Sequence, residues 1–179
     1  AKVHVEYRLD RSGAKSLDFE VANPRRWSPE DPHLYELEAA GERFRYGIRS
    51  FEFTADRGLV LNGSRYQLKG VNLHSDLGIL GMAFDRDAAR RQLAIMKDMG
   101  ANAIRTSHNA PASALLELCD EMGFVVWDEC FDRWNAFAGR RDEENLEDFC
   151  VRNLVEFVRR DRNHPSVFVW SIGHEIPLA

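Results

Sequence analysis

Apolar and polar residues alternate through the first part of the chain. The alternation covers residues 3–9, 16–21, 34–38 and 44–46, and Gly and Pro turns separate these segments. A period of two residues is typical of half-exposed antiparallel strands. We therefore predict four strands belonging to a β-sandwich. A sandwich of the immunoglobulin type has about seven strands, so only part of one is expected here.

A tight hairpin is predicted at residues 59–68. Asn62 and Gly63 lie between two apolar runs, and an Asn-Gly pair readily adopts the positive φ angles of a type I′ turn. The pattern of apolar and polar residues changes near residue 53. We therefore divide the chain into residues 1–52, the C-terminal part of the sandwich, and residues 53–179, a second domain.

Strands and helices alternate after residue 67. The predicted strands cover residues 67–71, 103–105, 124–128 and 167–171. Four successive β/α units imply an α/β fold with a parallel sheet and right-handed crossovers. The pattern fits both an open sheet and a closed barrel. No glycine-rich phosphate loop follows the first strand, which disfavours an open nucleotide-binding sheet.

Three helices are predicted between these strands. In the first, Ala89, Leu93 and Met96 share one face, Asp85 caps the start and Gly100 follows the end. The second begins at Ser113, carries Leu115, Cys119 and Met122 on one face, and is followed by Gly123. The third runs from about residue 146 to 160, and its apolar positions are Leu146, Phe149, Cys150, Leu154, Phe157 and Val158.

Composition indicates a soluble globular chain with a core: 44% of residues are hydrophobic, 30% are charged and the net charge is −5. There is no basic stripe for nucleic acid, and the apolar runs are shorter than the roughly 20 residues that span a bilayer. Cys119, Cys130 and Cys150 are odd in number and lack metal-ligand spacing, so we expect reduced thiols. This favours a cytoplasmic location, although any signal peptide would lie upstream of Ala1.

Polar residues gather where the four parallel strands end. They are Asn72, His74, Asp76, Arg105, Ser107, His108, Asn109, Asp128, Glu129, Asp132, His174 and Glu175. Parallel strands end at one rim, and the active sites of barrel enzymes lie at that rim. Carboxylates, imidazoles and a guanidinium together suit a ligand with many hydroxyl groups, and Glu175 can move a proton. A sugar is therefore the expected ligand.

Five segments at these strands form recognisable motifs: Gly70-Val-Asn-Leu-His74, Ile104-Arg-Thr-Ser-His-Asn109, Trp127-Asp-Glu129, Arg160-Asp-Arg-Asn-His-Pro-Ser-Val167 and Trp170-Ser-Ile-Gly-His-Glu175. In their order and spacing they resemble glycoside hydrolase family 2, the β-galactosidase and β-glucuronidase family. The resemblance implies the first half of a (β/α)8 TIM barrel, strands 1 to 4, preceded by part of an immunoglobulin-like β-sandwich.

The resemblance also implies roles for individual residues. Glu175 is expected to be the general acid/base of retaining β-glycoside hydrolysis. The expected substrate-binding residues are His74, Arg105, His108, Asp132 and His174. In this family the nucleophilic glutamate comes from a later strand, so we expect it beyond the chain and expect these 179 residues to be inactive alone.

The chain departs from the family pattern at two places. His174 stands where the family usually has Asn, whose amide would contact the sugar 2-hydroxyl. Arg133 and Asn135 stand where some β-galactosidases have the magnesium ligands Glu and His. We therefore predict no metal and no other cofactor.

Several alternatives stay open. Residues 76–78 and 131–134 look more like those of bacterial β-galactosidases than those of glucuronidases, so the resemblance favours β-galactosides. The alternatives are β-glucuronides, a degenerate family member or a non-catalytic carbohydrate-binding fragment. Arg105 is as well suited to an ion pair as to sugar binding, and Asp128 and Glu129 are expected to hold the rim together. Residues 159–162 are expected to form a solvated, salt-bridged turn. The exposed edge of residues 167–171 predicts either pairing of two copies as a homo-oligomer or marginal stability.

Overall fold

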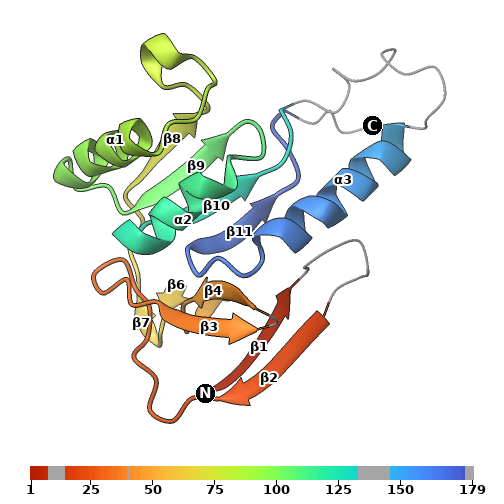
Figure 1. The fold of residues 1–179 in the computed structure, drawn as a ribbon. Helices are drawn as coiled ribbons and strands as arrows, with labels where there is room; N and C mark the ends of the chain where they lie inside the picture. Colours follow the sequence, from red (N-terminus) through yellow and green to blue (C-terminus); the bar gives the residue numbers. More distant parts are fainter. Residues whose placement is uncertain (8–14, 40, 133–145, 176–179) are drawn as a thin grey trace.

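The computed structural model describes residues 1–7, 15–39, 41–132 and 146–175 (Figure 1). Its centre is a parallel four-stranded sheet with strands in the order β11-β10-β9-β8. The strands are β8 (Gly70–His74), β9 (Ala103–Ser107), β10 (Val125–Glu129) and β11 (Val167–Ser171). Each strand pairs with the next one along the chain, as expected of successive right-handed β/α units.

Helices α1 (Arg86–Asp98), α2 (Ser113–Met122) and α3 (Leu146–Asp161) pack on one face of this sheet (Figure 1). The buried core between the layers contains Leu73, Ile104 and Val126 of the strands, together with Leu93 of α1 and Leu116 of α2. In an open doubly wound sheet, helices cover both faces. Consecutive strand order with helices on one face is the wall of a (β/α)8 barrel, which decides between the two architectures.

The helix boundaries follow the predicted signals. The Asp85 carboxylate accepts a hydrogen bond from the Ala88 N–H at 2.8 Å, and Gly100 after α1 has a φ of 88°. Helix α2 differs in detail, since its N-cap is Ala112, which makes no side-chain capping bond. Its most buried residues also differ from the predicted face: they are Leu116, Leu118, Cys119 and Asp120, whereas Leu115 and Met122 are half-buried.

The first parallel strand begins three residues later than predicted, at Gly70 instead of residue 67. The side chain of Asn102 explains the shift. Its Oδ1 accepts from the Lys69 N–H at 2.7 Å, and its Nδ2 donates to the Gln67 carbonyl at 2.9 Å. Because these backbone groups bind a side chain, regular pairing with β9 starts at Gly70. His74 is consequently the last residue of β8 and does not follow the strand.

The N-terminal region consists of antiparallel strands, as predicted. Strands β1 (Lys2–Tyr7) and β2 (Lys15–Glu20) form one pair, and β3 (Tyr35–Ala39) and β4 (Glu42–Tyr46) form another. A three-stranded sheet follows, made of β5 (Phe51–Thr54), β6 (Gly58–Leu61) and β7 (Ser64–Arg65). Asn62 and Gly63 between β6 and β7 have φ angles of 51° and 87°. The predicted type I′ hairpin is therefore confirmed.

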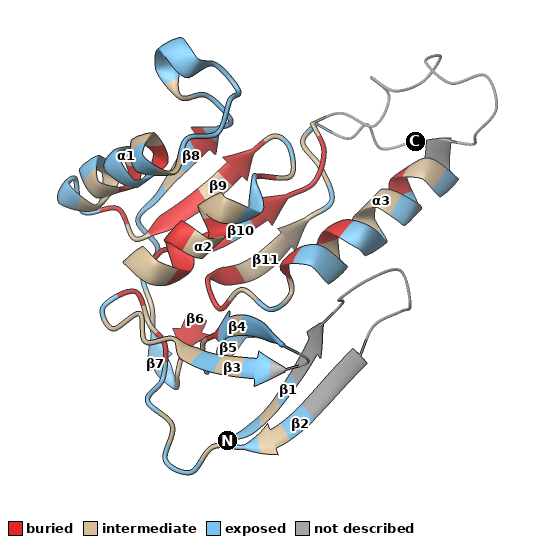
Figure 2. Ribbon diagram, viewed as in Figure 1, coloured by how far each residue is buried: buried red, intermediate tan, exposed pale blue. Residues whose placement is uncertain are grey.

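The N-terminal region packs against the amino ends of the parallel strands (Figure 2). Trp27 is fully buried against Ala103 and Val125, the first residues of β9 and β10. Its Nε1 donates to the Asp120 carbonyl at 2.9 Å, and the Phe51 ring lies 5.7 Å from that of Phe168. This packing closes the amino end of the sheet and leaves the carboxyl ends accessible.

The three cysteines are buried, as expected of small apolar residues. Within the described residues, no helix has the length and hydropathy required to cross a bilayer.

Candidate active site

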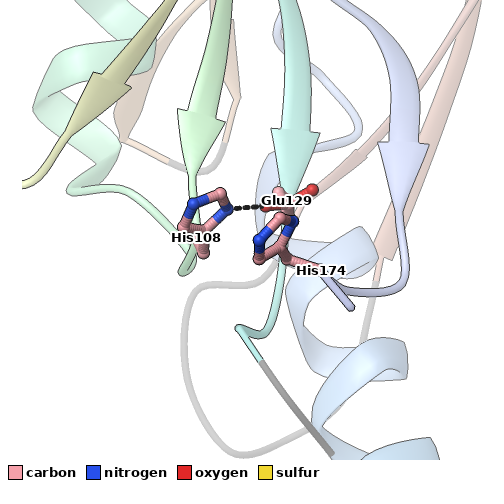
Figure 3. A group of neighbouring side chains, drawn as sticks. All are labelled: His108, Glu129 and His174. Carbon is pink, nitrogen blue, oxygen red and sulfur yellow. Dashed lines mark hydrogen bonds and ion pairs between the residues drawn. The ribbon is translucent and has the colours of Figure 1, made fainter. Parts of the chain in front are cut away.

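The carboxyl ends of the four parallel strands bring ionisable side chains together (Figure 3). His74 ends β8 and Glu129 ends β10. His108 directly follows β9, and His174 and Glu175 follow β11. Because the strands are parallel, these five residues share one rim of the sheet, as predicted.

Glu129 is the most connected side chain of the rim, although it is only 1% exposed. Its carboxylate accepts hydrogen bonds from Arg105 Nη2 at 2.8 Å, from His108 Nδ1 at 2.8 Å and from Ser171 Oγ at 2.8 Å. Burial raises the pKa of Glu129, but the hydrogen bonds from His108, Ser171 and Arg105 outweigh burial and leave this pKa below its usual value. Glu129 is therefore an ionised anchor that ties β9, β10 and β11 together.

This anchor determines the protonation of His108. An ionised carboxylate only accepts hydrogen bonds, so His108 Nδ1 must carry a proton that it donates to Glu129. Arg105 Nη2 also lies 3.3 Å from the same nitrogen. Both atoms are donors, so this approach is a contact and not a hydrogen bond. In neutral His108, Nε2 is left as an acceptor for a ligand hydroxyl.

The two histidines of β9 and β11 are stacked. The rings of His108 and His174 lie 3.8 Å apart with an interplanar angle of 16°, and Arg105 Nη2 is 3.2 Å from His174 Nδ1. The backbone N–H of His174 donates to the carbonyl oxygens of Phe131 and Asp132, at 3.0 Å and 2.8 Å. His174 is thus held through its ring and its backbone.

The predicted acid, Glu175, lies at the end of this row. Its side chain is 55% exposed, its φ is 47°, and its Oε1 lies 3.6 Å from His174 Nε2. At the other end, the ring of His74 is 5.2 Å from that of His108 and nearly perpendicular to it. His74, His108, His174 and Glu175 therefore form a continuous polar row. Asp132 joins it through its backbone carbonyl.

Arg105 occupies the place where a metal ion would bind. Ligand atoms of His108, Glu129 and His174 all lie within 4.8 Å of one another. However, Arg105 Nη2 lies 3.3 Å from His108 Nδ1, 2.8 Å from Glu129 Oε2 and 3.2 Å from His174 Nδ1. A guanidinium and a divalent cation repel each other, so this donor set fits Arg105 and does not fit a metal. Arg133 and Asn135 stand where some β-galactosidases have magnesium ligands, and they lie outside the described residues.

Asp128 does not belong to the rim, contrary to the prediction. Successive strand residues face opposite sides, so Asp128 points toward the helices while Glu129 points to the site. Asp128 is completely buried, and Thr106 Oγ1 donates to its Oδ1 at 3.3 Å. Burial, followed by the charge of Asp161, raises the pKa of Asp128 to about 8.

The run at residues 159–162 is salt-bridged, as predicted, but residues 159–161 belong to helix α3 and do not form a solvated turn. Asp161 is the last residue of α3 and is fully buried. Arg160 Nη2 donates to Asp161 Oδ2 at 2.5 Å and to the Pro111 carbonyl at 3.0 Å. The run therefore connects α3 to the loop before α2 and to the buried side of β10.

The remaining polar residues of the predicted rim have local roles. Asn72 Oδ1 accepts from Arg105 Nη1 at 3.4 Å, and Asp76 Oδ1 accepts from the Gly78 N–H at 2.8 Å. Ser107 is buried and Asn109 is exposed. Only Asn72 among these four contacts the guanidinium of the site in the described part of the chain.

A barrel wall with ionisable groups at the carboxyl ends of its strands defines the class of (β/α)8 barrel enzymes. Residues 53–179 match the model of the TIM barrel domain of glycosyl hydrolases family 2, and residues 2–42 match the model named glycosyl hydrolases family 2. The chain belongs to glycosyl hydrolases family 2. This confirms the expected family and the expected α/β fold, half of a TIM barrel after part of a β-sandwich.

Individual relatives agree with this assignment. A β-galactosidase of Bacteroides ovatus is 45% identical over 166 residues, which cover 87% of this chain and 20% of that protein. A putative β-glucuronidase of Formosa agariphila is 37% identical over 174 residues, covering 92% of this chain and 17% of that protein. A solved family 2 structure from Bacteroides cellulosilyticus has a TM-score of 0.79 and 38% identity, covering 94% of this chain and 24% of that one. The chain spans about a fifth of the length of its curated relatives.

Proposed function

We propose that this chain carries the acid/base half of the active site of a retaining β-glycosidase, with Glu175 as general acid/base. The observation that carries the proposal is the position of Glu175, which is 55% exposed at the carboxyl end of β11, with Oε1 3.6 Å from His174 Nε2. In a retaining mechanism this carboxyl group protonates the leaving-group oxygen and then deprotonates the attacking water. A carboxyl group at an accessible strand end is suited to both transfers.

The sugar would lie along the polar row and bind to His74, Arg105, His108, Asp132 and His174. The His108 Nε2 acceptor follows from the hydrogen bond between His108 Nδ1 and Glu129. Sugar hydroxyl groups both donate and accept, so they suit a row of imidazole nitrogens. Arg105 is part of this row, but its charge is already balanced by Glu129 at 2.8 Å. Its ion pair and a role in sugar binding are therefore compatible.

A retaining mechanism also needs a nucleophilic carboxylate about 5 to 5.5 Å from the acid. Glu129 is unsuited to this role because it is 1% exposed and accepts hydrogen bonds from Arg105, His108 and Ser171. Because Glu129 is buried, its oxygens are not accessible to an anomeric carbon. We assign the nucleophile to a glutamate outside these 179 residues.

A neutral sugar such as a β-galactoside fits the described rim better than a β-glucuronide. A uronate carboxylate needs an unneutralised cation. The guanidinium of Arg105 is paired with Glu129, and Asp76 adds negative charge after β8. This balance favours β-galactosides, the substrate class named for the Bacteroides ovatus relative.

Hydrolysis of nitrophenyl glycosides by the complete protein tests the proposal. We expect turnover of the β-galactoside, a much lower rate on the β-glucuronide, and a loss of about 10²- to 10⁴-fold for the phenyl β-galactoside in Glu175→Gln, the usual contribution of general acid catalysis. Glu38→Gln in exposed β3 is the matched control and should retain full activity. Unchanged activity of Glu175→Gln would contradict the assignment.

A further inference from the structure

Arginine imposes a single tautomer on His174. Arg105 Nη2 lies within hydrogen-bond geometry of His174 Nδ1 at 3.2 Å. A guanidinium has only donors, so Nδ1 must be the unprotonated acceptor of this pair. A neutral imidazole with a bare Nδ1 carries its proton on Nε2. The Nε2–H of His174 is the nitrogen that faces Glu175 Oε1, 3.6 Å away.

We propose that His174 is a positioning residue that presents this N–H to Oε1 of Glu175 and so orients the acid for proton transfer. The inference rests on the proposed function and deepens it. The separation of 3.6 Å is longer than a hydrogen bond. Catalytic contacts are often long in structures without substrate and shorten when substrate is bound.

Two further groups, Glu129 and His108, keep His174 in this state. Glu129 holds Arg105 through contacts at 2.8 Å and 2.9 Å, so the donor to Nδ1 is itself fixed. The stacked ring of His108 lies 3.8 Å away and restricts rotation of the imidazole. Within the described residues, the charged and titratable groups around His174 are Arg105 from β9, His108 after β9, Glu129 from β10 and Glu175 on its own segment. A proton on Nδ1 would face the guanidinium donor to donor, which disfavours it.

The arrangement assigns separate tasks to the two carboxyl oxygens of Glu175. Oε1 accepts from His174 Nε2–H, so Oε2 carries the transferable proton. In the first step the nucleophilic glutamate outside these residues bonds to the anomeric carbon, the bond from that carbon to the glycosidic oxygen breaks, and the proton of Oε2 moves to this oxygen. In the second step water bonds to the anomeric carbon, the bond from that carbon to the nucleophilic glutamate breaks, and water gives a proton to Oε2. His174 keeps its own proton throughout.

Replacing His174 by asparagine or by glutamine separates its contact with Arg105 from its contact with Glu175. The amide oxygen of Asn lies near the position of Nδ1 and can accept from Arg105, but Asn is too short to supply the N–H at Nε2. Gln extends to the Nε2 position and can donate to Glu175. The variants His174→Asn and His174→Gln therefore test the N–H independently of ring size.

The test measures kcat/KM of the complete protein on phenyl and on 2,4-dinitrophenyl β-galactosides. A phenyl leaving group needs proton assistance, whereas a dinitrophenyl group leaves as a stable anion without it. We expect His174→Asn to lose about tenfold on the phenyl substrate, a part of the usual effect of general acid catalysis, and to change much less on the dinitrophenyl substrate. His174→Gln should restore most of the loss, and His33→Asn in the N-terminal region should show none.

Equal losses on both substrates, no loss on either, or failure of glutamine to restore the phenyl activity would overturn the inference. Glu175→Gln measured beside these variants separates the two levels of the account. If Glu175→Gln keeps its activity on the phenyl substrate, the proposed function itself fails. The other outcome is that Glu175→Gln loses that activity while His174→Asn changes kcat/KM by the same factor on both substrates. In that case only the positioning role of His174 fails.

Discussion

His108 and His174 stack face to face at 3.8 Å, and their Nδ1 atoms lie within hydrogen-bond distance of groups of opposite charge, the Glu129 carboxylate and the Arg105 guanidinium. Glu129 accepts from His108 Nδ1, whereas Arg105 donates to His174 Nδ1. His108 Nε2 is therefore left as an acceptor for a sugar hydroxyl group. The Nε2 of His174 instead faces Glu175 Oε1, 3.6 Å away.

Nitrogen NMR of the complete protein with isotope-labelled histidine tests this assignment. We expect a signal of the Nδ1–H tautomer from His108 and a signal of the Nε2–H tautomer from His174 at neutral pH. The variants His108→Gln and His174→Gln identify the two signals by their loss. The same tautomer at both positions, or a doubly protonated His174, would contradict the structure.

Asp128 makes stability depend on pH. Burial raises its pKa to about 8, compared with about 3.9 in an unfolded chain. Between about pH 4 and about pH 8 the folded state holds a proton that the unfolded state releases, so stability falls as pH rises through this window. Asp128→Asn keeps an acceptor for Thr106 and removes the ionisable group.

We expect the Tm of Asp128→Asn to vary less between pH 5 and pH 8 than that of the wild type, and to exceed it at pH 8. The exposed Asp98→Asn at the end of α1 is the control and should follow the wild type. A wild-type Tm that rises across this window, or an Asp128→Asn profile identical to it, would show that the buried carboxyl group is not protonated in the folded state.

Gly123 is fixed by the packing of the N-terminal region against the end of α2. Its φ is 74°, and a Cβ added there would lie 2.3 Å from the Pro29 carbonyl oxygen. Gly100 has a similar φ of 88° but nothing within 4 Å of such a Cβ. Comparing Gly123→Ala with Gly100→Ala therefore separates the steric clash from the strain of a positive φ.

Gly100→Ala should cost about 1 to 2 kcal/mol from backbone strain alone. Gly123→Ala should cost clearly more, because the backbone of Pro29 must move as well. Thermal unfolding of both variants measures the difference. Equal losses in Tm would mean that the contact between Gly123 and Pro29 does not contribute to the attachment of the N-terminal region.

Local signals in the sequence were sufficient for most of the fold. Asp85 and Gly100 bracket α1, and Asn62 and Gly63 form their hairpin, because capping and turn geometry depend on neighbouring residues alone. The start of β8 was placed too early because it depends on Asn102, whose side chain binds the backbone of residues 67 and 69. That contact crosses more than thirty residues and leaves no local pattern.

For the site, too, local signals were sufficient for some features, whereas contacts between distant residues left no signal. The motifs named the residues of the rim, but they did not show that Asp128 and Glu129 face opposite sides of β10. Neither did they show the contact between Arg105 and His174, which are 69 residues apart. The central role of Glu129 had one usable signal, since it follows a buried strand and could be matched with Arg105 in the neighbouring strand.

Rescue of Glu175→Ala by azide tests the central claim, that Glu175 is the general acid/base of a retaining β-glycosidase. The complete protein carrying this change is given 2,4-dinitrophenyl β-galactoside, whose leaving group needs no acid. Azide then attacks the glycosyl-enzyme intermediate without help from a base. We expect azide to accelerate turnover severalfold and the product to be the β-galactosyl azide, with no such product from the wild type. No acceleration, or an azide of α configuration, would contradict the account.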